Sequence, residues 1–260
     1  MKEEQSDDQA QAPPPKEPTL EWGDATNRAP LYWFENFRPK TLDDILGQDE
    51  ITRVLKAWAR SKIRGIIPPI IVLHGDPGTG KTSAANAFLS DYLAIHGQPG
   101  EPLSAVRLDV PATVFRENPH SYLRTKILPR ISGQYLNSSN LDQFAILDDA
   151  SNFDKSTQRE ILRISESWRG GHLILLTNHL NKKFEEGLLD RASGANFFFK
   201  PVAFNLLRPR LMQIIRTNNM HFVDVEKTLA DAEANYNGSI RSALAFIAQA
   251  YALESLSQQT

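Results

Sequence analysis

Hydrophobic residues around position 50 and around position 70 follow two different patterns. In the stretch 48–62 they recur every three or four positions, which predicts an amphipathic helix: Ile51, Leu55, Trp58 and Ala59. The stretch 70–73 is instead continuously apolar, as expected of a strand buried on both faces. Pro68 and Pro69 end the connection between them, because proline interrupts regular backbone hydrogen bonding. A helix followed by a buried strand is therefore expected here.

The same two kinds of segment alternate over most of the chain. Further strands are expected at 105–110, 144–147, 173–177 and 196–199, and further helices ending near 93 and at 122–131 and 155–168. Strands separated by helices need crossover connections, which favour a parallel sheet covered on both faces. After Pro201 the strand pattern stops, and three helices are expected at 205–218, 224–235 and 239–256.

This pattern predicts the α/β class, with a five-stranded parallel sheet flanked by helices and followed by a small all-α unit. We expect three regions: a tail over 1–30, an α/β domain over 31–201 and a helical domain over 202–260. The tail is rich in proline and acidic residues and has too little apolar surface to offset the entropy of ordering, so we expect it to be disordered.

The composition excludes several classes of function. The 260 residues include no cysteine, which excludes disulfides, thiolate metal sites and cysteine nucleophiles. The 29 basic and 31 acidic residues nearly cancel, so no global basic field indicates nucleic acid, although local patches remain possible. The longest apolar run, 66–73, is broken by prolines, and the first residues lack the apolar segment of a secretory signal. These features predict a cytoplasmic protein that does not enter a membrane.

A nucleotide-binding motif follows the strand expected at 70–73. The residues fit G-x-x-x-x-G-K-[ST] in full: Gly75, Asp76, Pro77, Gly78, Thr79, Gly80, Lys81 and Thr82. Glycines let backbone N–H groups surround phosphate oxygens, and the start of the next helix adds a favourable dipole. Lys81 can reach the β- and γ-phosphates, and Thr82 can ligate Mg²⁺. The alternative is a glycine-rich structural turn, but its place between a strand and a helix favours ATP binding.

Two carboxylates follow another apolar strand, at 144–147. We expect Asp148 to hold Mg²⁺, directly or through water, and Asp149 to orient or deprotonate the attacking water. Acids at a strand end can instead simply meet solvent. Next to the glycine-rich motif, a magnesium–nucleotide site is the preferred interpretation.

Three stretches resemble one family of AAA+ ATPases, the clamp loaders, and within it the replication factor C small subunit. The stretch 33-WFENFRPKTLDDILGQ-48 is close to the family's opening W-x-E-K-Y-R-P-K-T-L-D-D-(V/I)-x-G-Q. The stretch 148-DDAS-151, with Gln158 and Arg163 after it, parallels the family's D-E-A-D segment and next helix. The stretch 238-GSIRSAL-244 parallels its lid motif G-D-x-R-x-A-L. The resemblance covers roughly 32–250.

The resemblance implies further roles at the nucleotide. The residues that would line its base and phosphate side are Arg38, Pro39, Ile45 and Leu46. Asn178, which ends a strand, matches the polar residue called sensor 1, whose amide can bind both the γ-phosphate and the attacking water. Arg241 matches sensor 2, a lid arginine that reads the γ-phosphate.

Arg191 matches the family's trans-acting arginine, which projects into the neighbouring subunit's site. This role requires a homo- or hetero-oligomer with head-to-tail interfaces. An intramolecular salt bridge is the alternative for this arginine. The family has serine where Asp190 stands here, and Asp190 could hold Arg191 back by pairing with it.

Two other departures from the family affect the expected activity. Asp149 stands where the family has glutamate and is one methylene shorter, so hydrolysis is expected to be slow. The family's third, helical collar domain is expected to be missing, because few residues follow the lid helices.

A basic stretch with an interleaved tyrosine could bind DNA phosphates: Arg116, Tyr122, Arg124, Lys126 and Arg130. A solvated helix face explains the same residues without a ligand.

Two functions remain open. One is a slow ATPase that resembles a clamp-loader subunit and assembles to act with DNA and a sliding clamp or other partner. The other is a nucleotide-gated AAA+ scaffold or regulator of a mobile-element or phage DNA process, with little turnover.

Overall fold

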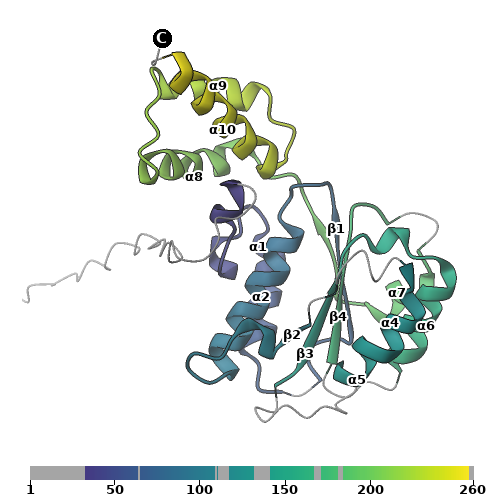
Figure 1. Ribbon diagram of the computed structural model, residues 1–260. Helices are drawn as coiled ribbons and strands as arrows, with labels where there is room; N and C mark the ends of the chain where they lie inside the picture. The colour runs from purple at the N-terminus through teal and green to yellow at the C-terminus, as the bar shows by residue number, and fades with distance from the viewer. Residues whose placement is uncertain are drawn as a thin grey trace, which may run out of the picture.

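In the computed structural model a five-stranded sheet of parallel strands forms the centre of the molecule (Figure 1). The structure describes residues 33–63, 65–108, 110, 117–131, 141–166, 171–180 and 184–257, and the predicted tail lies outside this part. The strands are β1 (Ile70–Gly75), β2 (Arg107–Leu108), β3 (Gln143–Leu147), β4 (Gly171–Thr177) and β5 (Asn196–Phe199). Their order is β2-β3-β4-β1-β5, and every pair is parallel. The predicted α/β class and parallel sheet are confirmed.

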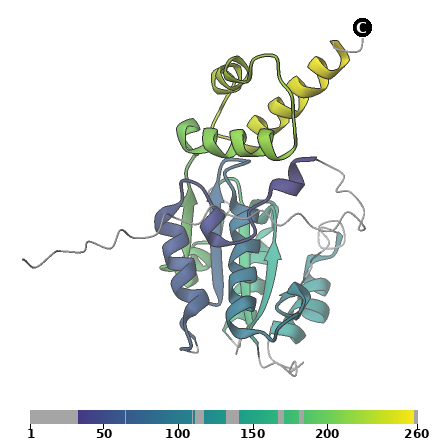
Figure 2. The ribbon, with the colours of Figure 1, turned by 90° about the vertical axis from the view of Figure 1, so that its left-hand side faces the viewer.

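Helices cover both faces of this sheet (Figures 1 and 2). One face carries α1 (Asp49–Arg60) and α2 (Lys81–His96). The other carries α4 (Pro119–Tyr122), a π-helical segment η4 (Leu123–Ile127), α5 (Leu128–Ile131), α6 (Lys155–Ser165) and α7 (Glu186–Arg191). The described residues also form short 3₁₀ turns: η1 (Trp33–Phe37), η2 (Leu42–Asp44), η3 (Leu103–Ala105) and η5 (Ala150–Asn152).

Successive residues of the central strand β1 supply two separate cores. Ile71 and Leu73 pack towards α1 and α2, while Ile70 and Val72 pack towards α5, α6 and α7. All four side chains are at most 1% exposed. Side chains in a strand alternate between its faces, so a strand with apolar residues at every position is stable only between two helical layers.

The second strand differs from its prediction. A strand was expected over 105–110, but β2 comprises only Arg107 and Leu108, and Ala105 belongs to the 3₁₀ turn η3. Val110 lies outside any strand. Among the described strands, β2 lies at the edge of the sheet and pairs with β3 alone, at Phe144 and Ala145. Its short apolar run therefore overstated the length over which the backbone pairs.

Three C-terminal helices lie beyond one end of the sheet (Figures 1 and 2). They are α8 (Phe204–Thr217), α9 (Val225–Ala234) and α10 (Ile240–Ser257), and they share a separate apolar cluster. Phe37, from the segment before α1, is buried in that same cluster at 5% exposure. Phe37 and Leu46 thus pack against the C-terminal helices, while Leu42 and Ile45 belong to the core under α1 and α2. The domain boundary near residue 202 stays a prediction. No helix in the described ranges is both long and apolar enough to cross a bilayer.

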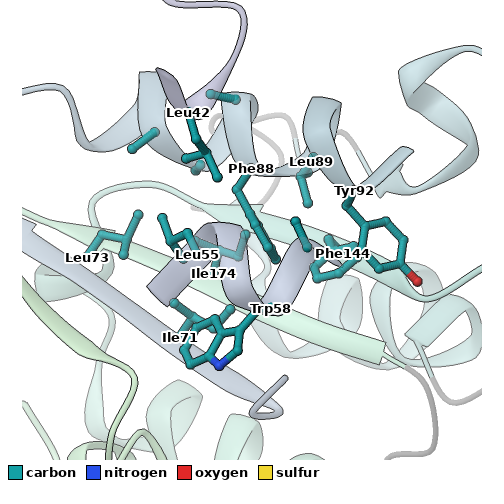
Figure 3. Close-up of a cluster of buried hydrophobic side chains, with 14 of the residues drawn as sticks. Leu42, Leu55, Trp58, Ile71, Leu73, Phe88, Leu89, Tyr92, Phe144 and Ile174 are labelled. Carbon is teal, nitrogen blue, oxygen red and sulfur yellow. The ribbon is translucent and has the colours of Figure 1, made fainter. Parts of the chain in front are cut away.

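Phe144 is expected to be a major contributor to stability (Figure 3). Its ring is fully buried, meets Phe88 edge-on with centroids 5.5 Å apart, and stacks on His172 at 4.8 Å. Phe144→Ala should lower the free energy of unfolding by about 3–5 kcal/mol, because the cavity left behind cannot close fully. Urea denaturation followed by circular dichroism measures the change.

Phe198 is the matched control for this substitution. It lies on the edge strand β5, and its side chain is 51% exposed. Phe198→Ala should change stability by only about 0.5 kcal/mol, as is usual for surface positions. Equal losses for the two alanine variants would contradict the placement of Phe144 in the core.

Candidate nucleotide-binding site

A cavity of about 240 Å³ lies where the carboxyl ends of the central strands meet the C-terminal helices. Three parts of the chain line it: the segment from Phe37 to Leu46, the glycine-rich turn after β1, and the facing sides of α8 and α10. Ligands of parallel α/β sheets typically bind beyond the carboxyl ends of the strands. The cavity therefore lies where this architecture places a ligand.

The glycine-rich turn has the backbone that its sequence requires. Gly78 and Gly80 adopt positive φ angles of 82° and 102°, which L-residues with a side chain rarely adopt. Gly80 is the N-cap of α2, so the helix begins at Lys81 with its free N–H groups directed out of its N-terminus. The cavity is lined by the motif from Pro77 to Thr82. The turn and helix terminus together form a site suited to phosphate.

Lys81 is held at the centre of this arrangement. Its Nζ donates hydrogen bonds to the carbonyls of Gly75 at 2.6 Å and Asp76 at 2.9 Å, and to Oδ1 of Asn178 at 3.1 Å. Burial lowers the pKa of the Lys81 ammonium, and the negative charge of Asp148 acts in the opposite direction. A buried cation with carboxylates nearby is well placed to receive a polyphosphate.

Asp148, Asp149 and Asn178 also line the cavity. The two acids follow β3 and the amide follows β4, and these strands are neighbours in the sheet with β4 next to β1. The backbone N–H of Asp149 donates to Oδ1 of Asp148 at 2.8 Å. Asp149 itself has a φ of 56°, an uncommon left-handed conformation for a residue other than glycine. Backbone outliers of this kind cluster at functional sites.

The four residues assigned to the base and phosphate side all line the cavity: Arg38, Pro39, Ile45 and Leu46. Arg38 is held by Glu35, with Nη2 2.8 Å from Oε1, and its Nη1 lies 3.4 Å from Oγ of Ser83 at the start of α2. The hydrogen bond from Arg38 lowers the pKa of Glu35. Arg38 is therefore oriented before any ligand binds.

Arg241 reaches the cavity from the first turn of α10. Its charge contributes to the lowered pKa values of both Glu35 and Lys81, so it acts on the same space as the glycine-rich turn. The backbone connects the two parts directly, since the N–H of Ile240 donates to the carbonyl of Gly78 at 3.1 Å. A Cβ on Gly78 would lie 2.0 Å from Oγ of Ser239. The start of α10 thus packs against the glycine-rich turn.

Arg191 does not line this cavity. It lies in the last turn of α7, and its Nη2 forms an ion pair with Oε1 of Glu166 at 2.9 Å. Both side chains are largely exposed, at 43% and 61%. The partner is Glu166 rather than the neighbouring Asp190. The intramolecular salt bridge considered as the alternative is therefore present, and the role in a neighbouring subunit stays a prediction.

Several cavity residues were assigned no role from the sequence. Four of them lie within the stretches that resemble the clamp-loader family: Phe37, Asp44, Ile240 and Leu244. The other four lie outside those stretches: Ser83, Leu207, Arg210 and Ile214. Leu207, Arg210 and Ile214 recur at helical spacing, but that spacing alone indicates only a helix with one buried face. Which face meets the glycine-rich turn depends on how α8 packs.

One arginine of the basic stretch, Arg124, forms an ion pair within the chain. Arg124 and Arg163 share one carboxylate, that of Glu160, at 2.8 and 2.7 Å. These bonds from Arg163 and Arg124 lower the pKa of Glu160 to about 2. Lys126 and Arg130 are exposed, and Arg116 lies outside the described residues. DNA binding by this stretch stays a prediction.

Similarity to known proteins extends over most of the chain, although no protein-family model matches it. The replication factor C small subunit 1 of Pyrobaculum arsenaticum is 26% identical over 197 residues, covering 75% of this chain and 55% of the relative. The replication factor C small subunit of Staphylothermus marinus is 27% identical, covering 86% and 63%. Human replication factor C subunit 4 is 27% identical, covering 88% and 60%. The chain resembles the replication factor C small subunit. It spans somewhat over half the length of these replication factor C subunits.

Solved structures show the same fold. A variant of RuvB from Thermotoga maritima matches with a TM-score of 0.57 at 15% identity, covering 79% of this chain and 63% of that protein. A DNA replication initiation factor matches with a TM-score of 0.58 at 15% identity, covering 84% and 68%. The replication factor C-like chain therefore has an AAA+ fold, as its motifs predicted.

Proposed function

We propose that the cavity binds ATP together with Mg²⁺. The observation that carries this proposal is the convergence of Lys81, Asn178 and the Asp148–Asp149 pair on one cavity with the glycine-rich turn. The Asp148–Asp149 pair follows β3, Asn178 follows β4, and the turn that leads to Lys81 follows β1. These three strands are neighbours, so the sheet brings the groups together. In this proposal residues 31–201 form the nucleotide-binding domain and residues 202–260 form the lid.

Each group has a defined task in binding. Lys81 exchanges hydrogen bonds to its own turn for bonds to the β- and γ-phosphates, while the N–H groups of Gly78 to Thr82 surround the other oxygens. Thr82 and Asp148 are the oxygen ligands for magnesium, which would neutralise phosphate charge when bound. Among the described residues no cluster of three or more His, Asp or Glu side chains is arranged to hold a metal. We therefore propose that magnesium would be held jointly by oxygens of the protein and oxygens of the phosphates.

Hydrolysis requires the two polar residues beyond the strand ends. In our proposal the Asp149 carboxylate accepts a proton from the attacking water, and the Asn178 amide orients that water against the γ-phosphate. Arg241 adds positive charge from the lid side. This charge stabilises the negative charge that develops on the phosphate oxygens in the transition state. Loss of the γ-phosphate would remove these contacts and release the lid, which links hydrolysis to conformation.

We further propose that the chain acts in DNA replication or a related DNA transaction as a clamp-loader-like subunit. The similarity to replication factor C small subunits supports this function. Assembly would be head to tail in a homo- or hetero-oligomer, with Arg191 of one subunit facing the nucleotide of the next. A sliding clamp or another DNA-processing factor would be the protein partner.

The test is a mass measurement by light scattering with ADP and with a non-hydrolysable ATP analogue, each with and without primed DNA. The ATP analogue should produce an oligomer that ADP does not support, because the γ-phosphate contacts stabilise the assembled state. A monomer under all four conditions would contradict the proposed assembly.

A second candidate is a nucleotide-gated scaffold or regulator with little turnover. Two observations favour it: the ion pair that holds Arg191 against Glu166, and the short carboxylate of Asp149 in the position of the water-activating residue. Steady-state phosphate release from the assembled protein distinguishes the two candidates. The clamp-loader-like function requires turnover that DNA stimulates, and the scaffold requires assembly without it.

A further inference from the structure

We infer that the guanidinium of Arg210 stacks on the purine base of the bound nucleotide and so contributes to base recognition. This inference rests on the proposed nucleotide site. The motifs of the sequence assign no role to Arg210, and its place in the cavity is evident only in the folded chain.

Arg210 lies on a face of α8 that otherwise lines the cavity with apolar side chains. Leu207, Arg210 and Ile214 all line the cavity, and their spacing of three and four residues puts them on one face of the helix. Leu207 and Ile214 are 1% and 2% exposed. Ile45 and Leu46 line the cavity from the segment before α1. Arg210 thus lies among the apolar side chains suited to a base, on an element separate from the phosphate-binding turn.

The guanidinium of Arg210 retains capacity to bind a ligand. Within the described part of the chain, its hydrogen bond is the one from Nη1 to Oε1 of Gln213, at 2.9 Å. Gln213 follows one turn later on the same helix. Its neutral amide orients the guanidinium but does not neutralise its charge as a carboxylate would. Arg208, two positions earlier, differs because it is paired with Glu226. An arginine that pairs with no carboxylate in the described ranges and lies next to apolar side chains is suited to stacking.

The chemistry of arginine fits a base better than a phosphate at this place. Its planar guanidinium stacks on aromatic faces through cation–π attraction, and its methylene stem packs on apolar side chains. A purine offers a larger face than a pyrimidine. Base stacking would be the same for a diphosphate and a triphosphate, whereas a phosphate contact would respond to the number of phosphates.

The experiment measures dissociation constants by isothermal titration calorimetry for ADP, a non-hydrolysable ATP analogue and CDP. Arg210→Met removes the charge and keeps a flexible apolar stem. The expected result is a loss of roughly 3- to 30-fold for ADP and for the ATP analogue by the same factor. The loss for CDP should be smaller, so the preference for ADP over CDP falls. Arg208→Met is the matched control and should bind like the unmodified protein.

Three results would overturn the inference. They are unchanged affinity in Arg210→Met, a loss that is larger for the ATP analogue than for ADP, and an equal loss in Arg208→Met. A loss of folded protein would lower ADP and CDP binding equally and leave the ratio of the two affinities unchanged. A change in that ratio therefore indicates a lost contact with the base. If the unmodified protein binds no nucleotide at all, the proposed function itself fails, which is distinct from the failure of Arg210 alone.

Discussion

Lys81→Ala is expected to weaken ATP binding on the order of 100-fold, because a buried cation that bonds to phosphate oxygens cannot be replaced by water in the same geometry. In the folded chain the ammonium already lies among Gly75, Asp76 and Asn178, within the cavity lined by the glycine-rich turn. Titration calorimetry with ADP and with a non-hydrolysable ATP analogue measures the loss. The protein should remain folded, since burial disfavours the charged lysine before the ligand binds.

Lys56→Ala is the control for this charge. Lys56 lies on α1, pairs with Asp43 and is not among the residues that line the cavity. This variant should bind both nucleotides like the unmodified protein. Unchanged affinity in Lys81→Ala would reject the nucleotide site, whatever the effect on stability.

Arg191→Ala is expected to leave ATP binding intact and to lower hydrolysis by the assembled protein on the order of 1,000-fold, as expected when an arginine that acts across a subunit interface is removed. The reason is its position: Arg191 lies outside the cavity of its own chain and ends α7 with an exposed side chain. Phosphate release at saturating ATP measures the rate. Mixing with Asp149→Asn subunits should restore part of it, because those subunits supply an intact Arg191 to a neighbour with an intact Asp149.

Glu166→Gln separates this role from the salt bridge within the chain. It removes the ion pair with Arg191 but keeps the arginine. Hydrolysis in this variant should be unchanged or faster, because Arg191 no longer has to leave a carboxylate. If Glu166→Gln loses activity as Arg191→Ala does, or if mixing never restores hydrolysis, the role across the interface is wrong.

Much of the fold could be predicted because its strands are continuously apolar. The runs at 70–73, 144–147 and 173–177 became β1, β3 and β4, with small shifts at their ends. These strands are buried on both faces, so local pattern and final environment agree. The prediction was least accurate at β2, which is two residues long, whereas β5 at the opposite edge has the expected bounds 196–199. At β2 the apolar pattern indicated that a strand is present but not how far its backbone pairs.

The candidate site also contains residues that the sequence could predict and residues that it could not. The motif from Gly75 to Thr82 combines local conformation and chemistry within eight residues, so its place in the sequence was informative. Arg191 and Arg210 show the limit of this reasoning. Both are arginines on helices, and nothing in their immediate neighbours shows that Arg191 pairs with Glu166 or that Arg210 lines the cavity. These outcomes depend on how separate helices pack.

The sequence by itself determined the α/β class, the glycine-rich turn and the acidic strand end, because each depends on the conformation and chemistry of consecutive residues. Only the tertiary structure decided which side chains share the cavity. The strand order brings Asp148, Asn178 and Lys81 to neighbouring positions, and α8 contributes Arg210 from more than a hundred residues beyond the turn. Such contacts arise from packing between distant segments, and the hydrophobic pattern specifies only that a helix has an apolar face, not which partner that face meets.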